Sequence, residues 1–268
     1  MNNIITLCLW LCASSFSAQD QEIGIIDFYG LRTVSVKEAR AALGIHEGTP
    51  LSVQSSELVK RLEHIPQVAL AQIEVVCCDA GKLILYAGIE ERGASHYDYR
   101  TPSGTDIKLP PEIDSAYDNF MNALREALRK GESGDDVSQG HSLVANPEAR
   151  RFQEQFLVFA RRYTDTLRIA LRTSSHASER AIAAQVLGYI ADKRLAVDDL
   201  LYAVSDPDDE VRNNATRALG AIAVLAQDKP GLGITISALP FIRMLNSVVW
   251  TDRRDVQYER ARFRHHGD

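Results

Sequence analysis

The sequence has few cysteines and lacks any pair of cysteines separated by two residues. It contains four cysteines, of which Cys8 and Cys12 lie in a predicted export signal. Removal of that signal leaves only Cys77 and Cys78, so a fold held together by several disulfides is excluded.

Positive charge is also scarce: 30 Lys and Arg stand against 36 Asp and Glu, for a net charge of −6. General nucleic-acid binders normally carry a basic excess, so no nucleic-acid partner is expected. Nothing favours an anionic membrane surface either. After residue 18 no run reaches the roughly 20 apolar residues that a spanning helix needs, so no transmembrane segment is expected in the mature chain.

Catalytic motifs are missing from the sequence. There is no P-loop and no G-x-S-x-G, and the glycines of KPGLG (229–233) lie in a loop. The seven histidines are scattered, and none precedes a glutamate in the helical repeats described below. The sequence therefore predicts no catalytic residue, no cofactor and no metal ligand, which indicates a protein that is not an enzyme.

Residues 1–18 are predicted to be a signal peptide. An apolar run at 4–13 is followed by small residues up to Ala18 and then by Gln19 and Asp20. The alternative is a buried N-terminal helix. We expect export, which places the mature protein in the periplasm or outside the cell.

Residues 19–92 are predicted to form a small α+β domain. Strand patterns occupy 22–31, 68–78 and 82–91, and helical patterns occupy 36–45 and 52–66. Ser35 is the expected N-cap of the first helix, and Asp79-Ala80-Gly81 the turn between the last two strands. The order is therefore β-α-α-β-β.

This stretch resembles a POTRA domain over residues 22–93. The likeness lies in IGIIDFYGLRTVS, GTPLS, IPQVALAQIEVV and LILYAGIEERG. The resemblance implies a binding module in which the strand at 68–78 lies at the sheet edge. Such an edge can pair with an extended peptide; the alternative is that the linker and helix after residue 92 cover it. The predicted partner-binding residues are Val68, Leu70, Gln72, Glu74, Val76 and Cys78.

Cys77 and Cys78 point to opposite faces of a strand, so they cannot chelate one ion without distortion. We expect one core thiol and one surface thiol. An intermolecular or a strained vicinal disulfide is the alternative.

Residues 93–150 are predicted to be a linker with one helix at about 113–130. Residues 92–111 are rich in turn formers and have no periodicity. No motif gives His96, Tyr97 or Tyr99 a partner acid or base.

Residues 151–252 are predicted to be helical repeats. ERAIAAQVLGYIAD (179–192) matches VRNNATRALGAIAV (211–224) at an offset of 32 residues. The matched positions form an apolar stripe with a glycine that lets a neighbouring helix approach closely. The predicted repeat-structural residues are Arg180, Ala183, Leu187, Gly188, Ile190, Asp206, Arg212, Ala215, Leu219, Gly220 and Ile222.

These segments resemble short bacterial HEAT repeats, and LLYAVSDPDDEVRNNATRALGAIA (200–223) carries the likeness. The resemblance implies an α-solenoid that binds proteins. A third copy is expected to begin near residue 236 with its turn at 250–253 and no second helix, followed by a disordered tail or truncated repeat at 253–268. The open end would dock on a partner, self-associate or continue beyond this chain.

The acids after Ser205 are expected to mark a helix start and not a cation site, with Asp206 as the N-cap. We therefore predict a non-catalytic scaffold of the bacterial periplasm or envelope that binds a protein or peptide. The alternatives are a HEAT-like enzyme or enzyme accessory, and a component of envelope assembly or secretion machinery.

Overall fold

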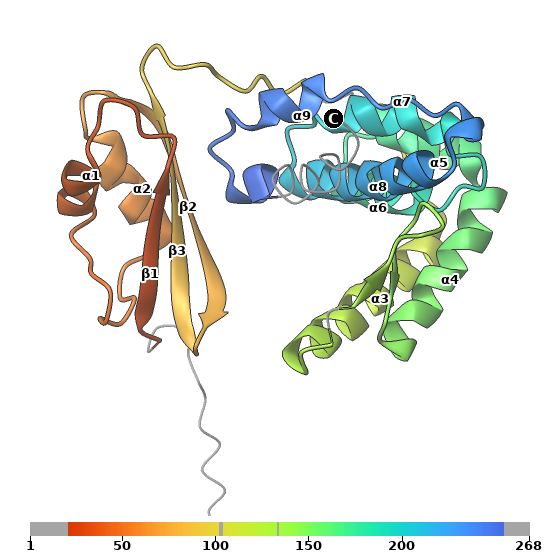
Figure 1. Ribbon diagram of the computed structural model, residues 1–268, viewed down its shortest axis with the longest axis horizontal. Coiled ribbons are helices and arrows are strands. Elements are labelled where there is room, and N and C mark those ends of the chain that lie inside the picture. Colours follow the sequence, from red (N-terminus) through yellow and green to blue (C-terminus); the bar gives the residue numbers. More distant parts are fainter. Residues whose placement is uncertain (1–20, 102–103, 133, 255–268) are drawn as a thin grey trace, which may run out of the picture. The chain divides into compact units, whose positions relative to one another are not determined.

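The computed structural model describes residues 21–101, 104–132 and 134–254, without the side chains of Cys77 and Cys78. The chain divides into two compact units, residues 1–92 and 93–268 (Figure 1). Each has its own hydrophobic core. The predicted signal peptide, most of the predicted tail and the predicted states of the two thiols lie outside the described residues.

The first unit is an α+β fold, as predicted, and its three strands form a mixed sheet. Its elements are β1 (Ile23–Tyr29), α1 (Val36–Leu43), α2 (Ser55–Glu63), β2 (Val68–Asp79) and β3 (Lys82–Glu91). The strand order is β1-β3-β2, with β1 parallel and β2 antiparallel to β3. The strand that follows α2 in the chain therefore lies at an edge of the sheet.

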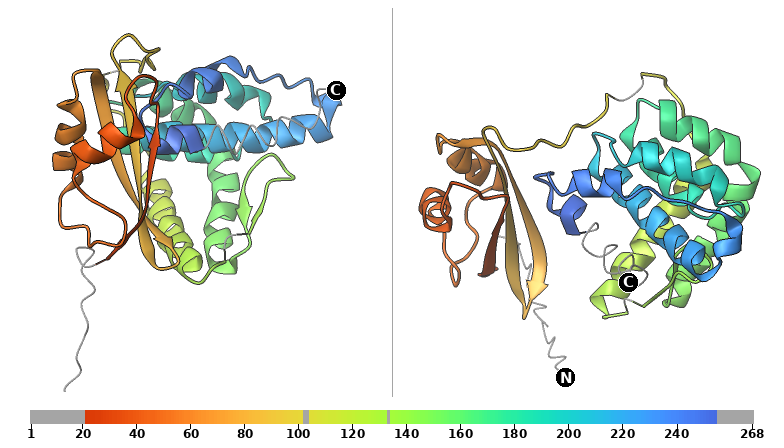
Figure 2. Two further views of the ribbon diagram at one scale, coloured as in Figure 1. Left: turned by 60° about the vertical axis from the view of Figure 1, so that its left-hand side comes forward. Right: turned by 45° about the horizontal axis from the view of Figure 1, so that its top comes forward.

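Helices α1 and α2 cover one face of this sheet (Figures 1 and 2). Apolar residues at helical spacing meet alternate strand residues, so that Leu43, Leu58, Leu62 and Leu85 are fully buried. Ser35 caps α1 by accepting the Glu38 N–H, which confirms the predicted helix start.

Two glycines are required by the backbone of the first unit. Gly30 ends β1 with φ +82°, and a Cβ there would lie 2.0 Å from the Ile89 carbonyl oxygen. Ala80 and Gly81 both have positive φ and form the two-residue turn that joins β2 to β3, which is the geometry of a primed hairpin turn.

The second unit is mainly helical. It contains α3 (Pro111–Arg129), α4 (Pro147–Arg162), α5 (Thr164–Thr173), α6 (Ala177–Leu187), α7 (Arg194–Ala203), α8 (Asp209–Asp228) and α9 (Leu239–Met244). The short strands β4 (Asp135–Asp136) and β5 (Leu143–Val144) form a hairpin before α4, and a 3-10 turn, η2 (Pro230–Leu232), follows α8. Of the helices in the described residues, none is long and apolar enough to cross a bilayer.

Helix pairs α5–α6 and α7–α8 form two successive repeats. Helix α6 packs on α8, and the apolar side chains at the matched positions are buried. A Cβ on Gly188 would lie 2.9 Å from the Ala218 Cβ, so glycine lets the end of α6 approach α8 closely. Helices α3 and α4 pack on each other and on α6, and thus flank the first repeat.

The turn of the third repeat lies earlier in the chain than the sequence predicted. The turn lies at Ser247–Val249, and residues 250–254 are already helical. A second helix therefore begins where none was predicted. The offset from Asp206 to Ser247 is 41 residues (247 − 206), against 32 between the first two turns, largely because α8 has 20 residues and α6 has 11.

Candidate partner-binding surfaces

The turns inside the three repeats share one hydrogen-bonding pattern. Each begins with a short polar residue whose side-chain oxygen accepts the N–H two residues later, at 3.2, 3.0 and 3.0 Å. Its carbonyl oxygen accepts a guanidinium N–H from the arginine six residues later, at 3.0, 2.7 and 3.4 Å. The turn residues are Ser174, Asp206 and Ser247, and the arginines are Arg180, Arg212 and Arg253.

Two of these arginines also join one repeat to the next by buried ion pairs. Arg180 donates two hydrogen bonds of 2.8 Å to the Asp206 carboxylate. Arg212 donates bonds of 2.8 and 2.9 Å to Asp252. The third turn begins with Ser247, where the second turn has Asp206. The Ser247 hydroxyl donates to the Asp252 carboxylate at 2.6 Å. Burial raises the pKa of the Asp252 carboxyl, and the Arg212 guanidinium opposes that shift.

Asp206 does not cap α8, so this part of the sequence prediction was wrong. The N-cap is Asp208, whose carboxylate accepts the Val211 N–H at 3.1 Å. Asp206 is fully buried and accepts from Arg180 and from Arg100. The carboxylate that joins two repeats is therefore distinct from the one that starts the helix.

An extended segment, residues 96–101 and 104–109, lies along this row of turns; we call it the strap. The Tyr97 hydroxyl donates to the Val204 carbonyl at 2.7 Å, and the Arg100 N–H donates to the Ser205 carbonyl at 2.7 Å. The Tyr99 hydroxyl lies 3.1 Å from the Ser247 Oγ, and the Arg212 guanidinium lies over the Tyr99 ring. The strap thus contacts the second and third turns directly.

The later part of the strap lies on the first turn. Thr105 forms a parallel β-bridge with Ser174, and Ser174 Oγ donates to the Ile107 carbonyl at 2.8 Å. The Leu109 N–H donates to the Glu179 carboxylate at 2.9 Å. The strap therefore crosses the turns in the direction opposite to their order in the chain, as part of the second unit and not as a free linker.

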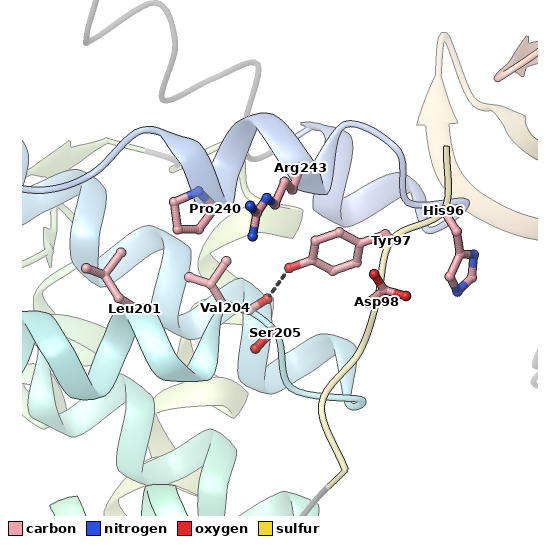
Figure 3. A pocket seen from close by; sticks show the side chains of 8 residues that line it. All are labelled: His96, Tyr97, Asp98, Leu201, Val204, Ser205, Pro240 and Arg243. Carbon is pink, nitrogen blue, oxygen red and sulfur yellow. Dashed lines mark hydrogen bonds between the residues drawn. The ribbon is translucent and has the colours of Figure 1, made fainter. Parts of the chain in front are cut away.

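A pocket of about 340 Å³ opens between the strap, the second turn and α9. Figure 3 shows Tyr97 in it with its hydroxyl directed at the Val204 carbonyl, and Arg243 reaching in from α9. His96 and Asp98 line the same pocket, so its lining carries charges of both signs. His96 and Tyr97 thus gain neighbours that no sequence motif indicated.

The edge strand β2 is a second candidate surface. At the opposite edge of the sheet, residues 48–51 cover the start of β1, because the Ile23 N–H donates to the Thr49 carbonyl and the Gly48 N–H to the Ile23 carbonyl. On β2, the Glu63 carboxylate accepts the outward Ala71 N–H at 3.2 Å. Beyond that residue, no strand of the described first unit pairs with the outer side of β2.

The predicted binding residues on β2 do not share one face. A register shift between Val68 and Leu70 turns Val68 into the core, where it is fully buried. Leu70 and Gln72 are exposed, whereas Glu74 and Val76 are half-buried. The Cys78 side chain lies outside the described residues. A bulge changes which face each later residue takes, and the alternation of residue types did not reveal it.

The predicted repeat residues all lie inside the second unit. Their side chains and the two matched glycines are buried. The sequence did not predict the position of the strap, because the residues that make its contacts follow no periodic pattern. Over the described residues, no group of three His, Cys, Asp or Glu side chains is arranged to hold a metal ion.

A family model of HEAT repeats matches residues 164–245. No curated protein and no solved structure matches the chain. The matched range begins at α5 and ends just after α9. It therefore covers both complete repeats and the first helix of the third. Residues 164–245 therefore form HEAT repeats, an architecture that typically binds other proteins.

Proposed function

We propose that this protein is a non-catalytic scaffold of the bacterial periplasm or envelope. It would bind a protein or peptide partner through the β2 edge and a second surface on the HEAT repeats. The edge position of β2 supports the resemblance of residues 22–93 to POTRA domains, and the HEAT repeats support a role in protein interaction.

The observation that carries the proposal is the open outer side of β2. Strand β2 runs for 12 residues, and in the described first unit no other strand pairs with its outer side. The Glu63 carboxylate accepts the Ala71 N–H on that side. Because the Ala71 N–H points outward, the amides of Ile73 and Val75 point outward too. These groups suit the addition of an extended peptide.

The repeat surface available to a partner differs from the row of turns, which the strap covers. Apolar residues are instead exposed on the first helix of each repeat: Ile169 on α5, Leu195 on α7, and Leu239 and Ile242 on α9. We propose that the partner contacts these helices.

Export is the part of the proposal that rests on residues 1–18. The apolar run followed by small residues supports a signal peptide. Mass spectrometry of the protein recovered from the periplasm or medium should give a chain that begins near Gln19. An unprocessed chain found only in the cytoplasm would contradict export.

The binding test uses capture by the exported chain, with partners identified by mass spectrometry. Lysines on an edge strand oppose strand pairing, so a Leu70→Lys/Gln72→Lys variant should lose the partner. A matched control, Val36→Lys/Ala41→Lys, adds the same charge at exposed positions of α1 and should keep it.

Amide exchange on the recovered complex locates the contact. Ile73 and Val75 amides should become protected when the partner binds. A partner retained by the β2 variant, without protection of these amides, would rule out edge pairing; turnover of a substrate by the purified chain would rule out a non-catalytic scaffold.

A further inference from the structure

A second pocket lies away from the strap, between α4, the β4–β5 loop and the turn from α6 to α7. Its volume is about 620 Å³, within the range of roughly 300–1,000 Å³ that takes small-molecule ligands. The walls include Leu143, Leu157, Val158 and Ile190. Leu157 and Val158 are exposed by 37% and 53%, so an apolar wall faces solvent there.

Lys193 is the charged group at the inner side of this pocket. It is only 4% exposed, and its Nζ donates to the Gly188 carbonyl at 2.6 Å and lies 3.4 Å from the His141 Nδ1. Its stem passes Gly140, where a Cβ would lie 3.1 Å from the Lys193 Cε and 2.7 Å from the Leu225 Cδ2. The loop therefore closes over the lysine stem and fixes the ammonium beside the pocket.

Among the described residues, the other buried cations have carboxylate partners, and Lys193 does not. Arg180 is paired with Asp206, and Arg212 with Asp252. In the described part of the chain no carboxylate lies within ion-pair distance of the Lys193 ammonium. The adjacent Asp192 is engaged by Arg194 through bonds of 2.8 and 2.7 Å. Since a buried charge without a counter-charge is costly, this arrangement favours an anion from outside the chain.

The surroundings of Lys193 keep the pocket cationic. Burial lowers the pKa of Lys193 to about 8, so it remains mostly protonated at neutral pH. Burial and the Lys193 charge lower the pKa of His141 to about 4, so the imidazole is neutral and its Nδ1 can accept. Arg161 adds a second cation from α4. None of the described residues that line this pocket is acidic.

We propose that this pocket binds a small monocarboxylic acid with an apolar body. The carboxylate would accept hydrogen bonds from the Lys193 ammonium, with Arg161 as the second positive group, and the hydrocarbon would lie along Leu157, Val158 and Ile190. This site is separate from the β2 edge and does not depend on the scaffold function.

The test is calorimetric titration of the full mature chain with decanoate, and with decan-1-ol as an uncharged ligand of the same length. Decanoate should bind saturably and decan-1-ol at least about tenfold more weakly, because a hydrogen bond to a charged group is worth about 1.5–3 kcal/mol. Lys193→Met should weaken decanoate binding by about ten- to hundredfold. The matched variant Lys130→Met, at an exposed position of the same unit, should leave it unchanged.

A second variant, at the protein surface, tests the same proposal if Lys193→Met does not fold. Val158 is exposed, so Val158→Glu should fold normally and should reduce decanoate affinity by placing a like charge at the pocket wall. Equal binding of decanoate by the wild type and by whichever of these two variants folds would overturn the proposal. So would equal affinity for decanoate and decan-1-ol, or no saturable binding of decanoate at millimolar concentration.

Discussion

Glu91 organises the loop that follows β1 in the first unit. Its carboxylate accepts the backbone N–H groups of Arg32, Thr33 and Val34 at 2.6–3.0 Å and also the Thr33 hydroxyl. It thereby holds the loop after β1 against the end of β3. Burial alone would raise the pKa of Glu91, but these hydrogen bonds lower it from 4.5 to about 2.

We predict that Glu91→Gln lowers the free energy of unfolding of the first unit by roughly 2–3 kcal/mol at pH 7, the scale of hydrogen bonds to a buried charged group. Because the folded pKa is depressed, the wild-type contribution is fully present above pH 4.5 and is lost as the pH falls toward 2. Urea unfolding at several pH values should show the difference between wild type and variant shrinking with acidity. A constant difference across this range would contradict the assignment.

The pair between Arg212 and Asp252 has a different consequence, because both side chains are 1% exposed. Arg212→Leu leaves the buried Asp252 carboxylate without its counter-charge and should destabilise the second unit by about 3–5 kcal/mol. Urea denaturation followed by Trp250 fluorescence measures this change. Arg194→Leu, which removes an exposed ion pair with Asp192, serves as the control and should change nothing measurable.

Among the elements, the strap combines an irregular sequence with a fixed position. Its amides at Arg100, Thr105 and Leu109 donate to groups on the repeats. Hydrogen exchange followed by mass spectrometry should therefore show peptides covering 96–101 and 104–109 protected to a degree similar to α6. Exchange within seconds across this segment would show that it behaves as a free linker.

Disruption of one strap contact gives a sharper test of the same element. Thr105→Pro removes the N–H that donates to the Thr173 carbonyl at 3.2 Å. We expect faster exchange in residues 104–109 and unchanged exchange in β3, which belongs to the other unit. Thr235→Pro, in the exposed loop after η2, controls for the general effect of a proline in this unit.

The sequence was sufficient for elements whose signal is periodic. The strands and helices of the first unit follow apolar alternation and helical spacing, and the 32-residue offset identified two repeats. The third turn was misplaced because residues 250–253, which were expected to form it, are already helical, and the turn begins three residues earlier at Ser247. Lys193 could not be selected because its distinguishing property, burial without a carboxylate partner, exists only in the folded chain.

At the scale of the whole molecule, the two units have separate hydrophobic cores. We predict that residues 19–92 and 93–268, expressed separately, each unfold cooperatively in urea. The shorter fragment should be the less stable, because about 70 residues bury a smaller share of their surface. A fragment that is monomeric but shows no cooperative transition would indicate that its core is incomplete.

The direction in which the strap crosses the repeats also has a consequence for synthesis. Tyr99 is made 148 residues before its partner Ser247, an interval of roughly 7–30 s at 5–20 residues per second. During that time the nascent chain carries the strap without the third turn. Final closure of the helical unit must therefore await the synthesis of Ser247, so this folding step is governed by a contact of long sequence separation.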